Sequence, residues 1–385
     1  MMDPELESIN QPQSTKSAHE IASLFDGDRL RQARHLALRT KQDLAIAVKV
    51  SPAAIGQFEA GVTPPRPELV GMLADALDVV PEFFMAGRPQ SKLESGDAFF
   101  RSLRATTARQ RAKATTYTEQ VWELVNAIER HVRLPVVNLP GFDGAEHVTA
   151  GSDPVATARA IRAHWGLGGE PVSHLVRLLE SQGVVAVLVP MVEDEVARID
   201  AFSTVALSRP LMVLSLDKGD DVFRHRFNAA HELGHLLLHG EATAGDPELE
   251  RQANQFAAEF LMPANMMLAE LPERFDLRRL AQLSERWGVS IKSLVYRSKE
   301  LGIISDSTAR RAYIRLEQLA SNPTVAPRPV RLFPGEVPAM LSQAVELAGT
   351  RGVTIVTLSN ELAWKPSHLR RLLGQTDTRP QLRLL

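Results

Sequence analysis

The sequence predicts a mostly helical α+β protein made of several domains, and three observations support this fold class. The chain has 385 residues, more than one typical domain holds, so two or three domains are expected. Apolar residues recur at helical spacing along most of the chain. Between residues 184 and 216, the segments VVAVLVP, ARIDAFSTV and LMVLSL are short, β-branched and bounded by turn residues, which predicts one small sheet.

The amino-acid composition narrows the class of protein and the kinds of site that are possible. The hydrophobic fraction of 44% is ordinary for a globular protein, and the net charge of -2 means that any binding to nucleic acid needs a local basic patch. The chain has no cysteine, which excludes disulfides and cysteine-ligated zinc. The polar N-terminus is unlike a signal peptide, and no apolar run is long enough to span a bilayer. We therefore expect a soluble cytoplasmic protein without a membrane partner.

Linkers and turn residues predict the order of the domains. The linkers are RPQSKLESGD, from residue 88, and the proline-rich NPTVAPRPVRLFPGEVP, from residue 322. The predicted parts are a disordered tail at 1–27, a helical module at 28–90, a core with the sheet at 98–270, a helix-turn-helix-like segment at 271–321 and a small helical domain at 335–385.

The segment RFNAAHELGHLLLHGE carries the first candidate site. His231 and His235 are spaced i, i+4, which places both imidazoles on one face of a helix, where they can meet one Zn²⁺ ion. Glu232 adjoins the first histidine and can act as a general base. Such a five-residue pattern also arises by chance. The apolar residues around it predict a buried helix from which the ligands project.

A second helix, DPELERQANQFAAEFLMP, offers the third ligand that zinc needs. Glu250 is the best candidate, and Asn254 lies one turn later on the same face, where it can orient a ligand histidine. Glu259 is a weaker candidate. His239 continues the i+4 series, but it is too far along a straight helix to share the ion, so we expect it to support the site or cap the helix. The prediction is one Zn²⁺ per chain.

Residues 28–61 carry a dense helix-turn-helix pattern with a local positive charge. Six basic residues against three acids leave +3: Arg29, Arg31, Arg34, Arg39, Lys41 and Lys49 against Asp28, Asp43 and Glu59. The third helix, which begins after Ser51, would enter the major groove of DNA. The expected DNA contacts are Arg39, Lys41, Ser51, Ala53, Ala54 and Gln57. That helix has no arginine to read guanine, so a protein-interaction module remains the alternative.

The residues resemble two known families. LRQAR, DLAIAVKVSPAAIGQFEAG and LADALDV are similar to an XRE-type (Cro/repressor-like) helix-turn-helix domain of five helices. DAFS, RFNAAHELGHLLLH and ERQANQFAAEFLMP resemble the ImmA/IrrE metallopeptidases in order and spacing. LSERWGVSIKSLVYRSKELGII resembles the segment that follows the peptidase core in that family. Together the resemblance covers roughly residues 28–320.

The resemblance implies a zincin-like core of the gluzincin type. Carried over, His231 and His235 would be metal ligands, Glu250 the third ligand and Glu232 the catalytic base. Asn254 departs from the aspartate of thermolysin-like enzymes and would orient a histidine without adding charge. Members of the peptidase family cleave helix-turn-helix repressors and so release stress, prophage or mobile-element genes. XRE-type modules usually work in pairs, which makes a homodimer a further expectation.

Two functions therefore remain open from the sequence. The first is a zinc endopeptidase with a DNA-binding front, acting on a repressor-like or antitoxin-like protein. The second is a transcription regulator whose metal site is structural or sensory and does not cleave. The presence of Glu232 favours the first, whereas four protein ligands on the metal would favour the second. A scaffold of helix-turn-helix pieces that binds proteins is a weaker third reading.

Overall fold

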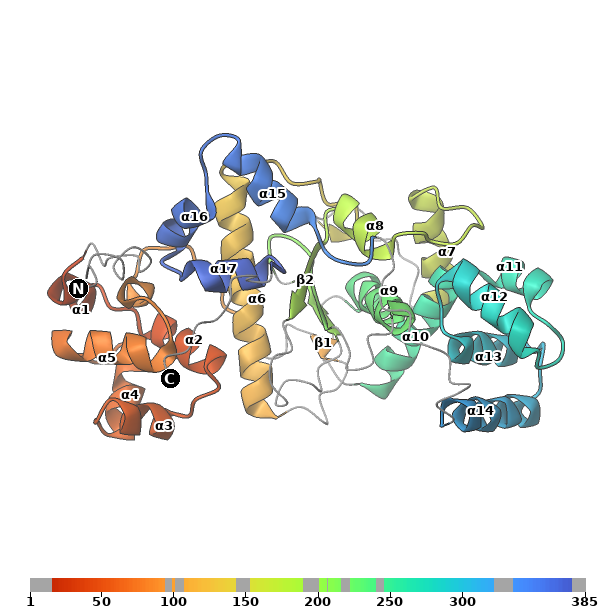
Figure 1. The fold of residues 1–385 in the computed structure, drawn as a ribbon, viewed down its shortest axis with the longest axis horizontal. Helices are drawn as coiled ribbons and strands as arrows, with labels where there is room; N and C mark the ends of the chain where they lie inside the picture. The colour runs from red at the N-terminus through yellow and green to blue at the C-terminus, as the bar shows by residue number, and fades with distance from the viewer. Residues whose placement is uncertain are drawn as a thin grey trace, which may run out of the picture. The chain divides into compact units, whose positions relative to one another are not determined.

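The structure is a computed structural model that describes residues 16–93, 99–100, 107–142, 153–189, 201–205, 207–215, 222–239, 246–321 and 335–375 (Figure 1). Contacts divide the chain into two compact units. The first unit joins 1–95, 107–133 and 341–385, and the second joins 96–106 and 134–340.

The first unit begins with short helices joined by tight turns. They are α1 (Ala18–Ser23), α2 (Gly27–Leu36), α3 (Lys41–Ala47), α4 (Pro52–Glu59), α5 (Pro67–Leu77) and the 3-10 helix η2 (Pro81–Phe84). Thr40 starts α3 with a capping box, because its hydroxyl accepts the N–H of Asp43 and the Asp43 carboxylate accepts the N–H of Thr40. Ser51 caps α4, and Pro52 follows at the first helical position. The helices α2 to α5 with η2 confirm the predicted five-helix domain.

Helix α1 lies inside the stretch that was expected to be a disordered tail. Its Ile21 side chain is only 1% exposed, and the helix packs against α5 and η2. Burial of this apolar side chain provides the stabilisation that a purely polar tail would lack. The rest of the predicted tail, residues 1–15, lies outside the described residues.

The long helix α6 (Ala108–Glu129) packs against both the N-terminal and the C-terminal helices of the first unit. Arg29 of α2 forms a buried ion pair with Glu123 of α6, at 2.6 Å. The last helices, α16 (Ile355–Leu362) and α17 (Pro366–Leu372), follow α15 (Met340–Gly349), and His368 of α17 bonds Gln120 of α6 at 2.7 Å. The linear boundaries predicted above place α6 within 98–270, whereas its contacts group it with the helix-turn-helix helices.

The second unit contains a four-stranded sheet in the order β1-β3-β4-β2. Its strands are β1 (Phe99–Phe100), β2 (Val185–Val189), β3 (Ala201–Thr204) and β4 (Leu211–Ser215). β4 pairs in parallel with β2 and antiparallel with β3, so that Val213 lies opposite both Val187 and Phe202. The three predicted segments supply β2, β3 and β4, although residues 197–200 of ARIDAFSTV lie outside the described residues.

Eight helices of the second unit are described: α7 (Pro154–His164), α8 (Leu175–Ser181), α9 (Val222–Leu238), α10 (Pro247–Leu261), α11 (Ala264–Glu270), α12 (Leu277–Trp287), α13 (Ile291–Glu300) and α14 (Asp306–Ala320). α9 packs against β3 and β4 and, most extensively, against α10. Gly234 permits this approach, because a Cβ there would lie 3.0 Å from the ring of Phe256 on α10. The two helices are therefore held close along the stretch that carries the histidines.

A buried ion pair fixes the first half of α9. Arg226 is fully buried and pairs with Glu336, while its Nε donates to the carbonyl of Gly288 at 2.8 Å. Glu336 also accepts the backbone N–H of Leu175 at the start of α8, at 2.8 Å. Because an unpaired buried charge costs several kcal/mol, about 3–5 when one partner is removed, these groups hold α9, α8 and the turn after α12 together.

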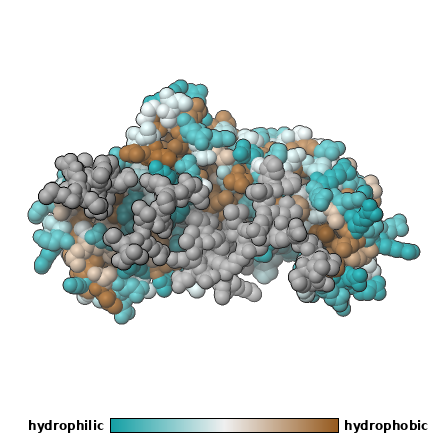
Figure 2. Space-filling model, in the orientation of Figure 1, coloured by the Kyte–Doolittle hydropathy of each residue, from teal (hydrophilic) through white to brown (hydrophobic). Residues whose placement is uncertain are grey.

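The described surface mixes hydrophilic and hydrophobic residues (Figure 2). None of the helices that the structure describes is long and apolar enough to cross a membrane.

Candidate functional site

The side chains of His231, His235 and Glu250 meet at one point between α9 and α10. Their candidate ligand atoms all lie within 4.8 Å of one another. The Nε2 atoms of the histidines are 3.0 Å apart, and they lie 3.3 and 3.5 Å from the two carboxylate oxygens of Glu250. A tetrahedral zinc ion with bonds of about 2.0–2.1 Å requires ligand atoms about 3.3 Å apart. The donor set and its spacing therefore fit Zn²⁺.

Local structure explains why Glu250 lies where it does. Asp246 caps α10 by accepting the N–H of Glu248, and Pro247 occupies the first helical position. Glu250 therefore falls in the first turn, where the positive end of the helix dipole favours a carboxylate. On α9, the four-residue spacing places His231 and His235 one turn apart on the same face.

Asn254 sets the tautomer of His231. Its Oδ1 lies 3.1 Å from the Nδ1 of His231. A carbonyl oxygen only accepts hydrogen bonds, so the proton of this imidazole is on Nδ1. The lone pair is then on Nε2, the atom that faces Glu250.

His239 and Gln252 set the tautomer of His235 in the same way. The Oε1 of Gln252 lies 3.0 Å from the Nε2 of His239, and the Nδ1 of His239 lies 2.8 Å from the Nδ1 of His235. If Gln252 accepts from Nε2, then His239 accepts at Nδ1 from the Nδ1–H of His235. His235 is left with its lone pair on Nε2, which faces Glu250. His239 thus lies behind His235, with both of its ring nitrogens already engaged.

The charge states agree with this arrangement. Burial lowers the pKa of His239 below its ordinary value, which keeps its ring neutral, as an acceptor must be. Burial alone would raise the pKa of Glu250, but hydrogen bonds and charge from His231 and His235 outweigh it and hold that pKa at about 2. Glu250 is therefore ionised, which is the form in which a carboxylate binds a metal ion.

Glu232 is held by a residue on the sheet. The hydroxyl of Ser203 on β3 donates to the Oε2 of Glu232 at 2.7 Å. Ser203 belongs to the DAFS segment, which was part of the family resemblance but received no role from the sequence. The contact fixes the orientation of the carboxylate that was predicted to be the general base.

The residues of the cluster differ in their exposure to solvent. His231 and Glu232 are 0% exposed and His235 is 1% exposed, whereas the side chain of Glu250 is 22% exposed. Glu250 is therefore the member of this cluster that is most open to solvent. Glu259 lies outside the cluster, because it is buried and forms ion pairs with Arg297 and with Arg159.

The expected DNA contacts lie on α3, on α4 and in the turns before them. Ser51, Ala53 and Gln57 are exposed and Ala54 is half-buried. The hydroxyl of Ser51 also caps α4 by accepting the N–H of Ala54 at 3.1 Å. The Ser51 hydroxyl, which was expected to contact DNA, therefore also has a structural role.

The basic patch is smaller than the sequence suggested. Arg29 is buried against Glu123, and Arg34 is buried against Glu59, with Nε 2.5 Å from the carboxylate. Lys41 also lies 3.4 Å from Glu59, so part of its charge is neutralised. Arg39 has no ion-pair partner among the residues that the structure describes.

Two family comparisons match separate parts of the chain. Residues 27–82 match a family described as a helix-turn-helix domain, and residues 180–299 match a peptidase family described as the IrrE N-terminal-like domain. No curated protein matches the sequence. The second match spans β2 to α13 and includes every residue of the metal cluster. The chain therefore carries a helix-turn-helix domain and an IrrE N-terminal-like peptidase-family domain in one polypeptide, as the resemblance predicted.

Proposed function

We propose that this chain is a DNA-binding regulator that is also a zinc endopeptidase, and that its substrate is a helix-turn-helix repressor or an antitoxin-like protein. The observation that carries the proposal is the convergence of two imidazole lone pairs and an ionised carboxylate on one point. His231, His235 and Glu250 would hold the ion. Three protein ligands leave a tetrahedral ion one open position, which is typical of catalytic rather than structural zinc.

Each residue then has a separate task. A bound zinc ion supplies Lewis-acid chemistry that polarises a peptide carbonyl and activates water. Glu232, oriented by Ser203, accepts a proton from the attacking water at its carboxylate and returns it to the leaving nitrogen. Asn254 and His239 keep the ligand imidazoles in the tautomers that leave Nε2 free for the ion.

One observation favours a second function, a regulator with a structural or sensory metal site. His231, Glu232 and His235 are almost completely buried, which suits a closed metal site. Against it stands the position of His239, whose ring nitrogens face His235 and Gln252, so the described residues offer the ion no third histidine as a fourth ligand.

The proposal is tested by cleavage of candidate repressors encoded near the gene. Full-length protein with Zn²⁺ is incubated with each repressor, and wild type is compared with Glu232→Gln and with Glu285→Gln. Glu285 is an exposed acid on α12, away from the cluster, and serves as the matched control. Loss of the general base should slow cleavage by about 10²–10⁴-fold, whereas the control should cut at the wild-type rate.

Equal rates for Glu232→Gln and wild type would contradict the catalytic assignment. If the wild-type protein binds zinc stoichiometrically but cuts none of the candidates, the structural or sensory function is favoured instead.

A further inference from the structure

A groove of about 660 Å³ lies in the helical segment that follows the metal site. One wall is formed by the residues just before and at the start of α12, and the other by one face of α14. The lining residues are Glu273, Arg274, Phe275, Leu277, Thr308, Arg311, Ala312, Arg315 and Leu319. None of them belongs to the metal cluster or to the helix-turn-helix domain at 27–82.

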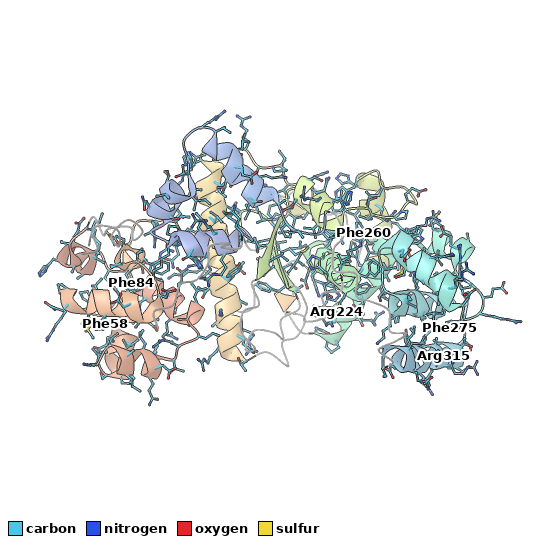
Figure 3. The ribbon with its side chains drawn as sticks, viewed as in Figure 1. Phe58, Phe84, Arg224, Phe260, Phe275 and Arg315 are labelled. Atoms are coloured by element: carbon cyan, nitrogen blue, oxygen red, sulfur yellow. The ribbon has the colours of Figure 1, made fainter. Side chains whose placement is uncertain are left out.

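The α14 wall is a single helical stripe. Its five lining residues, from Thr308 to Leu319, follow the spacing i, i+3, i+4, i+7 and i+11, which keeps them on one face. Ala312 is buried, and Leu319 is half-buried, as are Phe275 and Leu277 on the opposite wall. Phe275 and Arg315 lie near each other in Figure 3, one before α12 and the other on α14. The groove therefore has an apolar floor.

Three arginines surround this floor. Arg274, Arg311 and Arg315 are all exposed, and none of the three has a carboxylate within ion-pair distance among the described residues. Arg311 donates to the Thr308 hydroxyl at 3.2 Å, which directs its guanidinium along the stripe. Two like charges one turn apart on a helix repel each other. An anionic partner would remove this repulsion, and guanidinium groups bind carboxylates in a bidentate manner.

We propose that this groove binds an acidic amphipathic segment of a partner protein. Apolar side chains of the segment lie on Phe275 and Leu319, and its carboxylates pair with Arg311 and Arg315. Duplex DNA fits the surface less well, because a phosphate backbone gains nothing from an apolar floor. The volume also exceeds what one phosphate or sulfate fills.

Binding is tested with full-length protein and a fluorescent peptide, Leu-Glu-Glu-Leu-Leu-Glu-Glu-Leu, in a fluorescence anisotropy titration. A second peptide carries lysine at each glutamate position. The protein variants are Arg311→Gln/Arg315→Gln and the matched control Arg310→Gln. Arg310 is exposed on the same helix but does not line the groove. The double variant should bind the acidic peptide at least about tenfold more weakly, and the control should bind it like wild type. The lysine peptide should not bind.

Three results would overturn the proposal: equal binding by the double variant and wild type, binding of the lysine peptide as tightly as the acidic one, or displacement of the acidic peptide by random-sequence duplex DNA. Thermal unfolding of each variant shows that the fold is retained. Because no cleavage is measured and no metal is added, the outcome is independent of the proposed peptidase activity.

Discussion

At the scale of single residues, the chemistry of the proposed metal site depends on hydrogen-bond partners that are not themselves proposed ligands. Asn254 acts on His231, and the pair His239 and Gln252 acts on His235. Each contact places a proton on the outer ring nitrogen and leaves the inner one free. Two independent contacts thus leave the inner nitrogens of both imidazoles free for the proposed ion.

We expect His239→Phe to weaken zinc binding by about 10–100-fold, because His235 loses the acceptor that fixes its tautomer. The ring volume is largely kept, so the fold should persist. Affinity is measured by competition with a chromophoric chelator. His164→Phe, an exposed histidine on α7, is the control and should bind zinc normally. Unchanged affinity in His239→Phe would show that this contact has no effect on the ligand.

At the scale of elements, the site depends on how α9 is held against its neighbours. Arg226 joins α9 to the turn at Gly288, which ends α12 with a left-handed φ of 62°. A Cβ at Gly288 would lie 2.7 Å from the Nε of Arg226. The turn and the ion pair are therefore packed as one unit.

Gly288→Ala should lower the free energy of unfolding more than Gly302→Ala does. Gly302 has a similar φ of 73° after α13, but no atom lies within 4 Å of the position its Cβ would occupy. Both substitutions place a side chain at a left-handed φ, which costs about 1–2 kcal/mol. Only Gly288→Ala also displaces Arg226. Urea unfolding of the two variants measures the difference. Equal losses would contradict the close packing at Gly288.

In the helix-turn-helix domain, Arg39 and Lys41 differ in their ion-pair partners among the described residues. Arg39→Ala should weaken binding to random-sequence duplex DNA more than Lys41→Ala, because Glu59 already neutralises part of the Lys41 charge. The slope of log K against log salt should fall by about 0.9 for Arg39→Ala, which corresponds to one lost phosphate contact. Titrations at several salt concentrations measure both. A larger effect of Lys41→Ala would contradict this prediction and would assign the phosphate contact to Lys41 instead of Arg39.

At the scale of the whole molecule, the features that depend on local sequence patterns could be predicted, whereas the contacts between distant segments could not. The i, i+4 histidines, the caps at Thr40 and Ser51 and the β-branched strands are all short-range features, and the structure shows the helices and strands that they predict. Gln252 was missed because it falls off the face that Glu250 and Asn254 share.

Contacts between distant segments gave no such pattern. Ser203 reaches Glu232 from 29 residues away, and Arg226 reaches Glu336 from 110 residues away. The same reason explains why α6 was placed with the wrong neighbours, since its partner Arg29 is 94 residues earlier in the chain. Burial of these charges depends on the tertiary fold and leaves no periodic trace in the sequence.

The central claim is that His231, His235 and Glu250 hold one zinc ion with an open position. The most direct test is the coordination of zinc in the metal-loaded full-length protein, by X-ray crystallography with anomalous scattering. We predict two imidazole nitrogens, a carboxylate oxygen of Glu250 and one non-protein oxygen, each at about 2.0–2.2 Å. Four protein ligands, or zinc bound at other residues, would contradict the claim.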